Sequence, residues 1–325
     1  MKLSSALIIL GMHRSGTSLL SGLLSQVGVV MGKRLYAPQK GVNEKGFWEH
    51  EDIVDTHDEL LLTLNSQWDD VLPLPDKWWE SEAVRPFVGR LNAYVRRDFS
   101  NATVWALKDP RMCRILPLWL PILAHEQANP VFVCMNRNPF EVVGSLQNRD
   151  GFSREKALVL WLSHALSAEY YSRGHPRVFT DFDQVVKKPM EVLLKIEKEA
   201  NVIFPTPVDR AAEKIEDFVS PDLRHHEADA KHGHANQGLA LMAQELYRLF
   251  LKMSSGHESQ YDLIDEIAED FLAYQNRWDP ELIEQIHYLN QERADYRIKF
   301  FRIYKSWSWQ LAKPLWLIEK MLRKY

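Results

Sequence analysis

The chain has 325 residues, of which 46% are hydrophobic and 26% are charged, and this composition excludes a disordered or low-complexity protein. Two cysteines are too few for a disulfide framework, which favours a reducing compartment. The net charge of −4 argues against a nucleic-acid-binding protein.

The first predicted element is a buried strand over residues 6–10, an apolar run too short for the core of a signal peptide. A glycine-bearing turn follows over residues 11–18, and leucines at helical spacing come next. Strand, glycine loop and helix together are typical of the opening of an α/β phosphate-binding fold. Because no apolar run reaches the roughly 18 residues that span a bilayer, we expect a cytoplasmic protein.

The loop over residues 11–18 has the glycine spacing of a P-loop, in which backbone N–H groups and a helix dipole hold an anion. It lacks the lysine that serves the β- and γ-phosphates in nucleoside triphosphatases, and Arg14 stands inside the loop instead. Around Gly16 the loop also offers hydroxyl groups on Ser15, Thr17 and Ser18. These residues predict a strong anion site. The missing lysine counts against a nucleotide kinase or NTPase, which stays as an alternative.

Strands and helices are predicted to alternate along the rest of the first 220 residues. The further strands lie at 104–107, 131–135 and 178–180, and the helices lie at 51–64, 80–98, 139–148, 154–173 and 189–200. This alternation predicts an α/β fold, a P-loop-like parallel sheet with helices on both faces. Ligands bind beyond the carboxyl ends of such strands, and Lys108 and Arg137 follow the second and third strands.

The alternation of predicted strands and helices ends near residue 220. Residues 221–238 are interpreted as a linker or a nucleotide-covering loop, and residues 239–325 as a C-terminal helical extension. Amphipathic patterns predict helices in this extension at 239–253, 261–275 and 280–305. We therefore predict one α/β domain over residues 1–220 followed by a helical part.

Two of these motifs resemble those of the sulfotransferases that use 3′-phosphoadenosine 5′-phosphosulfate (PAPS). The segment from Arg14 to Ser18 resembles the first motif of that family, whose loop binds the 5′-phosphosulfate. Arg137-Asn138-Pro139, with Ser145 eight residues after Arg137, resembles the second motif, which binds the 3′-phosphate. The resemblance covers roughly residues 5–220 and is closest to bacterial, cell-surface glycan-type members whose loop reads Gly-Met-His-Arg-Ser-Gly-Thr-Ser.

The resemblance implies an enzyme that moves a sulfuryl group from PAPS to a hydroxyl of a glycan, a lipid-linked saccharide or a small molecule. It implies 3′,5′-ADP as the product and no metal. Lys108 stands where members carry a lysine near the transferring group, and Arg224 where a basic segment reaches the 3′-phosphate in several members. A non-catalytic scaffold in surface-polysaccharide assembly, with a retained nucleotide pocket, is a further alternative.

The attacking hydroxyl needs a base. Related enzymes use a glutamate after the first helix or a histidine near the middle-strand lysine, and Pro110 occupies the place of that histidine here. The segment 41–51 resembles a substrate-side segment in which Gly-aromatic-aromatic-Glu recurs, so Glu49 is our candidate, with His50 and Asp109 as alternatives. A structural interpretation of Glu49, as a carboxylate that begins a helix, stays open.

Three other features leave alternatives open. His225, His226, His232 and His234 occur in pairs, but no cysteine or well-spaced carboxylate completes a tetrahedral metal site. Trp68, Trp78 and Trp79 either line an acceptor site or pack the core. Residues 297–325 contain eight Lys or Arg and one Glu, together with tryptophans. This mixture predicts either docking at the inner, anionic face of a membrane or a contact between the two chains of a homodimer.

Overall fold

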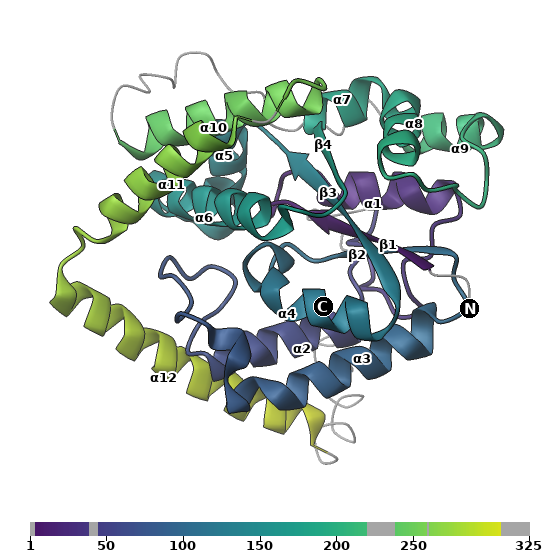
Figure 1. Cartoon of the computed structure of the whole chain (residues 1–325). Helices are drawn as coiled ribbons and strands as arrows, with labels where there is room; N and C mark the ends of the chain where they lie inside the picture. Colours follow the sequence, from purple (N-terminus) through teal and green to yellow (C-terminus); the bar gives the residue numbers. More distant parts are fainter. Residues whose placement is uncertain (1–3, 39–44, 220–237, 259, 307–325) are drawn as a thin grey trace, which may run out of the picture.

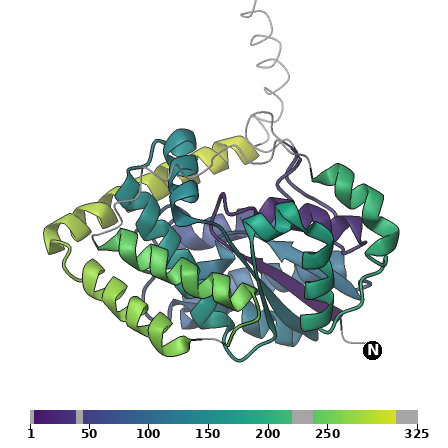
Figure 2. The same ribbon diagram turned by 90° about the horizontal axis from the view of Figure 1, so that it is seen from above.

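The computed structural model describes residues 4–38, 45–219, 238–258 and 260–306 (Figure 1). Its sheet has four parallel strands in the order β2-β1-β3-β4. The strands are β1 (Ser4–Leu10), β2 (Val104–Lys108), β3 (Ala128–Asn136) and β4 (Arg177–Asp181). Helices cover both faces of this sheet (Figures 1 and 2). The predicted α/β class and the four predicted strands are confirmed.

The central strand β1 explains why its sequence is apolar throughout. Ala6, Ile8 and Leu10 point into one hydrophobic core, whereas Leu7 and Ile9 point into the other. Because successive side chains of a strand face opposite sides, a strand buried on both faces needs a continuous apolar run. The larger core contains residues of α2 (Glu51–Thr63), α3 (Arg85–Phe99), α4 (Met112–His125), α5 (Pro139–Asp150) and α6 (Arg154–Ser172). The smaller core contains residues of α1 (Thr17–Gln26), α7 (Phe182–Lys187), α8 (Pro189–Glu199) and α9 (Ala212–Phe218).

Helix α4 is not among the predicted helices, and neither are the short helices α7 and α9. Pro117 and Pro121 lie inside α4, and prolines normally end helices because they lack an N–H and clash with the preceding turn. The backbone leaves the helical region at Ile115 (φ −109°, ψ 17°), just before Pro117. The kink accommodates the proline, and burial of the apolar surface of α4 in the larger core holds it against the sheet.

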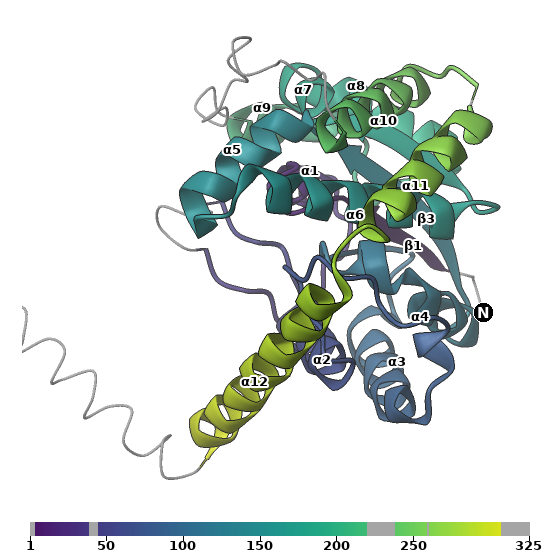
Figure 3. The same ribbon diagram turned by 90° about the vertical axis from the view of Figure 1, so that its left-hand side faces the viewer.

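The helices predicted as an extension are present as α10 (Leu239–Ser254), α11 (Tyr261–Gln275) and α12 (Pro280–Lys305). Leu246 and Phe250 of α10 and Ile264 of α11 are buried in the larger core, so these two helices pack on the α/β part. By contrast, α12 runs out as an arm (Figure 3). Within the described ranges, no helix combines the length and the apolar character that crossing a membrane requires. Arg224, the four paired histidines and the tail beyond residue 306 lie outside the described residues.

A buried histidine in α6 predicts a loss of stability in acid. The Nδ1 atom of His164 lies 2.8 Å from the carbonyl oxygen of Leu160, and burial, assisted by Arg114, lowers the pKa of His164 to about 3. As the pH falls below about 6.5, His164 is therefore protonated in the unfolded chain but stays neutral in the folded chain. The contribution of His164 to the free energy of unfolding is therefore complete above pH 6.5. It decreases as the pH drops and is smaller by about 2 kcal/mol at pH 5.

We expect the free energy of unfolding, measured by urea denaturation, to change less between pH 7.5 and pH 5 in His164→Asn than in the wild-type chain, by about 2 kcal/mol. The matched control is His257→Asn, because His257 is exposed and its Nδ1 also contacts a backbone carbonyl, that of Lys252 at 3.2 Å. An unchanged pH dependence in His164→Asn contradicts the assignment.

Candidate active site

The loop between β1 and α1 has a backbone that few sequences can adopt. Arg14 and Gly16 are both left-handed, with φ of 69° and 88°. At Gly16 a Cβ atom would lie 2.4 Å from the ring of Phe182, so only glycine fits. Arg14 is not a glycine, and holding a non-glycine residue in the left-handed conformation costs about 1–3 kcal/mol. Such backbone strain is common at functional sites. The helix α1 then begins at Thr17, with its first N–H groups lacking helical partners.

The second motif meets this loop in space. The guanidinium of Arg137 donates from Nη1 to the carbonyl oxygen of Arg14 at 3.1 Å, although the two residues are 123 positions apart. In turn, Nε of Arg14 donates to Oγ of Ser145 at 2.8 Å. Because β3 pairs directly with β1, the carboxyl ends of these two strands are neighbours. The structure thus brings together Arg14, Arg137 and Ser145.

The guanidinium of Arg137 is held in place from two further sides. Its Nε donates to Glu141 at 2.8 Å, one helical turn away, and the guanidinium lies 4.1 Å from the centre of the Phe182 ring. Asn138 accepts a hydrogen bond from the N–H of Phe140 and so begins α5, with Pro139 as the first residue of the helix. The side chain of Arg137, which follows β3, is therefore held in one orientation toward the loop between β1 and α1.

A third group comes from the end of β2. The ammonium of Lys108 donates to Oγ of Ser18 at 3.2 Å and forms an ion pair with Glu49. The side chain of Lys108 is 2% exposed and that of Glu49 is 12% exposed, so the pair is nearly removed from water. Glu49 reaches Lys108 because the chain turns sharply at Trp48, whose φ is 59°.

These groups surround a cavity of about 320 Å³ at the carboxyl ends of β1 and β2. It is lined by His13, Arg14, Thr17, Ser18, Phe47, Glu49, Trp68, Lys108, Pro110, Arg111, Arg149 and Asp150. Arg137 and Ser145 do not line the cavity themselves but lie behind Arg14, which contacts both. Ser15 is buried and lines a small interior cavity on the other side of the loop. The structure therefore places Arg14, Thr17, Ser18, Glu49 and Lys108 around one space.

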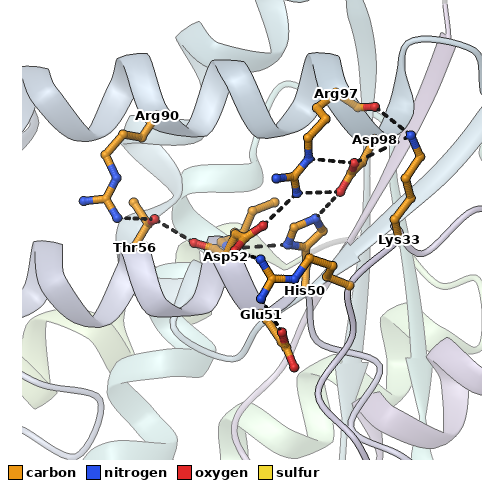
Figure 4. A network of polar contacts seen from close by, with 10 residues as sticks. Lys33, His50, Glu51, Asp52, Thr56, Arg90, Arg97 and Asp98 are labelled. Carbon is orange, nitrogen blue, oxygen red and sulfur yellow. Dashed lines mark hydrogen bonds and ion pairs between the residues drawn. The ribbon is translucent and has the colours of Figure 1, made fainter. Parts of the chain in front are cut away.

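The two alternative bases are engaged elsewhere. Nε2 of His50 lies 2.6 Å from Asp98, and its Nδ1 accepts a hydrogen bond from the N–H of Ile53, so that His50 caps α2 (Figure 4). Figure 4 shows this histidine inside a network of ion pairs that joins α2 to α3. His50 is therefore placed as a structural residue that does not line the cavity.

Asp109 is also part of a buried structural network. Its carboxylate accepts from Arg111 at 2.9 Å and lies 2.7 Å from Nδ1 of His57. The indole N–H of Trp119 donates to Nε2 of the same histidine at 2.9 Å, so Nε2 is the acceptor and Nδ1 donates to Asp109. Burial alone would raise the pKa of Asp109, but Arg111 and His57 hold it below its usual range. Of the three candidate bases, Glu49 alone lines the cavity.

The cavity is also lined by His13, Arg111 and Arg149, for which the sequence predicts no role. The ring of His13 packs on Trp68 with ring centres 4.5 Å apart, and its Nε2 is buried without a hydrogen-bond partner among the described residues. Burial, assisted by Arg111, His164 and Arg149, lowers the pKa of His13 well below its usual value, so the ring is neutral at pH 7. Arg149 could have been found from spacing, because it lies four residues after Ser145 on one face of α5. Arg111 has no comparable signal, since its position depends on α2.

The predicted tryptophans separate into two places. Trp68 lines the cavity of the loop. Trp78 and Trp79 line a different cavity of about 630 Å³, which also contains residues of α6 and α11. In the described part of the chain, no group of three or more His, Cys, Asp or Glu side chains is placed to hold a metal ion.

No protein-family model and no curated protein matches the chain. It is similar to several solved structures. One is the sulfotransferase domain of the olefin synthase of Synechococcus PCC 7002, at 16% identity over 77% of this chain and 96% of that one, with a TM-score of 0.45. The sulfotransferase domain of the curacin biosynthetic pathway has 14% identity over 80% and 100% of the two chains (TM-score 0.38). The sulfotransferase STF9 of Mycobacterium avium has 16% identity over 86% and 78% (TM-score 0.43).

Proposed function

We propose that the chain is a PAPS-dependent sulfotransferase whose acceptor is a hydroxyl group, on a glycan or lipid-linked saccharide. The observation that carries this proposal is the contact between the two anion-binding motifs, in which Arg137 reaches the carbonyl of Arg14 and Arg14 reaches Ser145. PAPS carries anionic groups on both sides of one ribose. Two anion sites in contact with one another, at the ends of neighbouring strands, suit a molecule of this kind.

The charges around the loop fit a multivalent anion. Burial, together with the nearby positive charges of Arg149 and Arg137, lowers the pKa of Arg14. A lowered arginine pKa means that cations are crowded in a partly desolvated place, and a bound anion relieves this crowding. The dipole of α1 adds a positive end at Thr17. The site is therefore built for a ligand with more than one negative charge.

The residues of the cavity can divide the chemistry of sulfuryl transfer among them. Arg14 and the loop N–H groups hold the 5′-phosphosulfate, and Arg14 and Lys108 stabilise the negative charge on the departing phosphate oxygen. Arg137 and Ser145 hold the 3′-phosphate. Glu49 accepts the proton of the acceptor hydroxyl as the new oxygen–sulfur bond forms and the bond from sulfur to the phosphate oxygen breaks. Trp68 and Phe47 offer apolar walls on which the face of a sugar ring can pack.

Calorimetric titration of the full chain tests this proposal without knowledge of the acceptor. We expect 3′,5′-ADP to bind at least 100-fold more tightly than ATP with Mg²⁺. We also expect it to bind at least 10-fold more tightly than 2′,5′-ADP, which has the same charges but places one phosphate on the neighbouring carbon. Equal affinity for 3′,5′-ADP and 2′,5′-ADP would overturn the assignment of the second motif, and tighter binding of ATP with Mg²⁺ would favour a kinase or NTPase.

A further inference from the structure

Helix α12 carries an exposed apolar seam along its length. Its members follow one another at alternating steps of four and three residues: Leu282, Ile286, Leu289, Tyr296, Phe300 and Ile303, with Arg293 at the remaining position. Five of the six side chains are between 50% and 68% exposed, and Ile286 is half-buried. Steps of four and three give the 3.5-residue period of a two-stranded coiled coil, sustained here over three heptads.

A different face of α12 already packs on the body of the protein. Asn290 accepts a hydrogen bond from Gln67 at 3.1 Å and Ala294 is buried, and Arg293, at the edge of the seam, reaches sideways to within 3.7 Å of Asp69. These contacts fix the helix to the loop that precedes α3, and Figure 3 shows it projecting beyond the body. The helix is therefore held in a defined orientation while Leu282, Leu289, Tyr296 and Ile303 of the seam stay at least half exposed.

The charges on α12 are divided between its two halves. Residues 281–292 contain three Glu and no Lys or Arg, whereas residues 293–305 contain five Lys or Arg and one Asp. Acidic residues near the start of a helix and basic residues near its end suit the helix dipole, but that effect is confined to the first and last turns. Here the division extends over the whole helix. Two copies aligned in opposite directions place each acidic half against a basic half, whereas parallel copies place like charges together.

We propose that α12 pairs with α12 of a second copy of this chain as an antiparallel coiled coil. In an antiparallel coiled coil the two kinds of seam position alternate across the interface, so Ile286 lies opposite Ile303 of the second copy and Leu289 opposite Phe300. In this arrangement the apolar seams of the two copies face one another, and the acidic half of each helix lies beside the basic half of the other. The inference is independent of the proposed enzymatic activity.

A membrane surface is less suited to the same face. An anionic bilayer attracts basic segments but repels acidic ones, and the first half of α12 is acidic. A seam with a 3.5-residue period is also narrower than the broad apolar face with which helices lie in a bilayer interface. The features of α12 therefore favour a second copy of the chain.

Sedimentation velocity of the full chain at micromolar concentration tests the pairing. We expect a dimer for the wild-type chain and a monomer for Leu289→Glu, with the dissociation constant raised at least 100-fold, because each substitution affects the seam twice. The matched control is Gln291→Glu, which adds the same charge to an exposed position outside the seam. Thermal unfolding monitors the fold of both variants. A monomeric wild-type chain, or a dimer that Leu289→Glu leaves intact, would overturn the proposal.

The direction of the pairing is tested by disulfide formation. Ile286→Cys and Ile303→Cys are prepared separately, and both native cysteines are buried. On oxidation, an equimolar mixture should give crosslinked dimers and neither variant alone should do so. Crosslinking of each variant alone would show parallel pairing and contradict the antiparallel arrangement. Flotation with anionic vesicles provides the last arm, because vesicle binding by a monomeric wild-type chain that Leu289→Glu abolishes would assign the seam to a membrane instead.

Discussion

Replacing Arg137 with alanine is expected to weaken the binding of 3′,5′-ADP by about 30- to 1000-fold, equivalent to about 2–4 kcal/mol. The guanidinium contacts the carbonyl of Arg14, Glu141 and the face of Phe182, so its position is determined before any ligand arrives. A preorganised arginine contributes more to binding than a mobile one, because little rotamer freedom remains to be lost.

The substitution series separates charge from shape. Arg137→Lys keeps the positive charge but cannot reproduce two parallel hydrogen bonds to a phosphate, so an intermediate loss of about 10-fold is expected. Arg210→Ala, at an exposed position on a short turn, serves as the control. Calorimetry supplies the affinities, and thermal unfolding shows whether loss of the ion pair with Glu141 has damaged the fold. A well-folded Arg137→Ala protein with wild-type affinity would remove the second motif from the site.

Replacing Glu49 with glutamine is expected to lower the turnover of PAPS by about 100- to 10,000-fold while leaving the affinity for 3′,5′-ADP within about threefold of wild type. The amide cannot accept the proton of a hydroxyl, whereas 3′,5′-ADP lacks the sulfuryl group and does not need a base. Release of 3′,5′-ADP from PAPS, with water or an added alcohol as acceptor, gives the rate, and calorimetry gives the affinity.

The same substitution changes the electrostatics of Lys108. Without the carboxylate, this buried ammonium loses its charged partner, and loss of one member of a buried pair costs about 3–5 kcal/mol. We therefore also expect Glu49→Gln to unfold at a lower temperature and to regain stability on addition of PAPS. Glu51→Gln is the matched control, because Glu51 lies two residues along the same segment and pairs with Arg34 outside the cavity. Equal rates for the two variants would show that Glu49 is not the base.

The sequence predicts those parts of the site that are continuous along the chain. The loop around Arg14 and the turn around Arg137 each join a strand to a helix within a few residues, so local spacing contains their geometry. Their meeting could also be predicted, since parallel strands end at one edge of a sheet. By contrast, the roles of His50 and Asp109 depend on Asp98 and His57, about 50 residues distant in sequence, and no local pattern records those contacts. The helix α4 could not be predicted either, because its two prolines disfavour a helix locally and only the burial of its apolar residues in the larger core compensates for the kink.

The order of the strands in the sheet affects how the protein is made. Of the four strands of this sheet, β1 is synthesised before the others and occupies an interior position, and its two neighbours begin only at Val104 and Ala128. Ribosomes add about 5–20 residues per second, so the apolar residues of β1 emerge some 10 s before both edges of the strand can be paired. During this interval the newly made segment is a ready substrate for chaperones, and truncated chains that end before residue 128 lack a partner that the central strand requires.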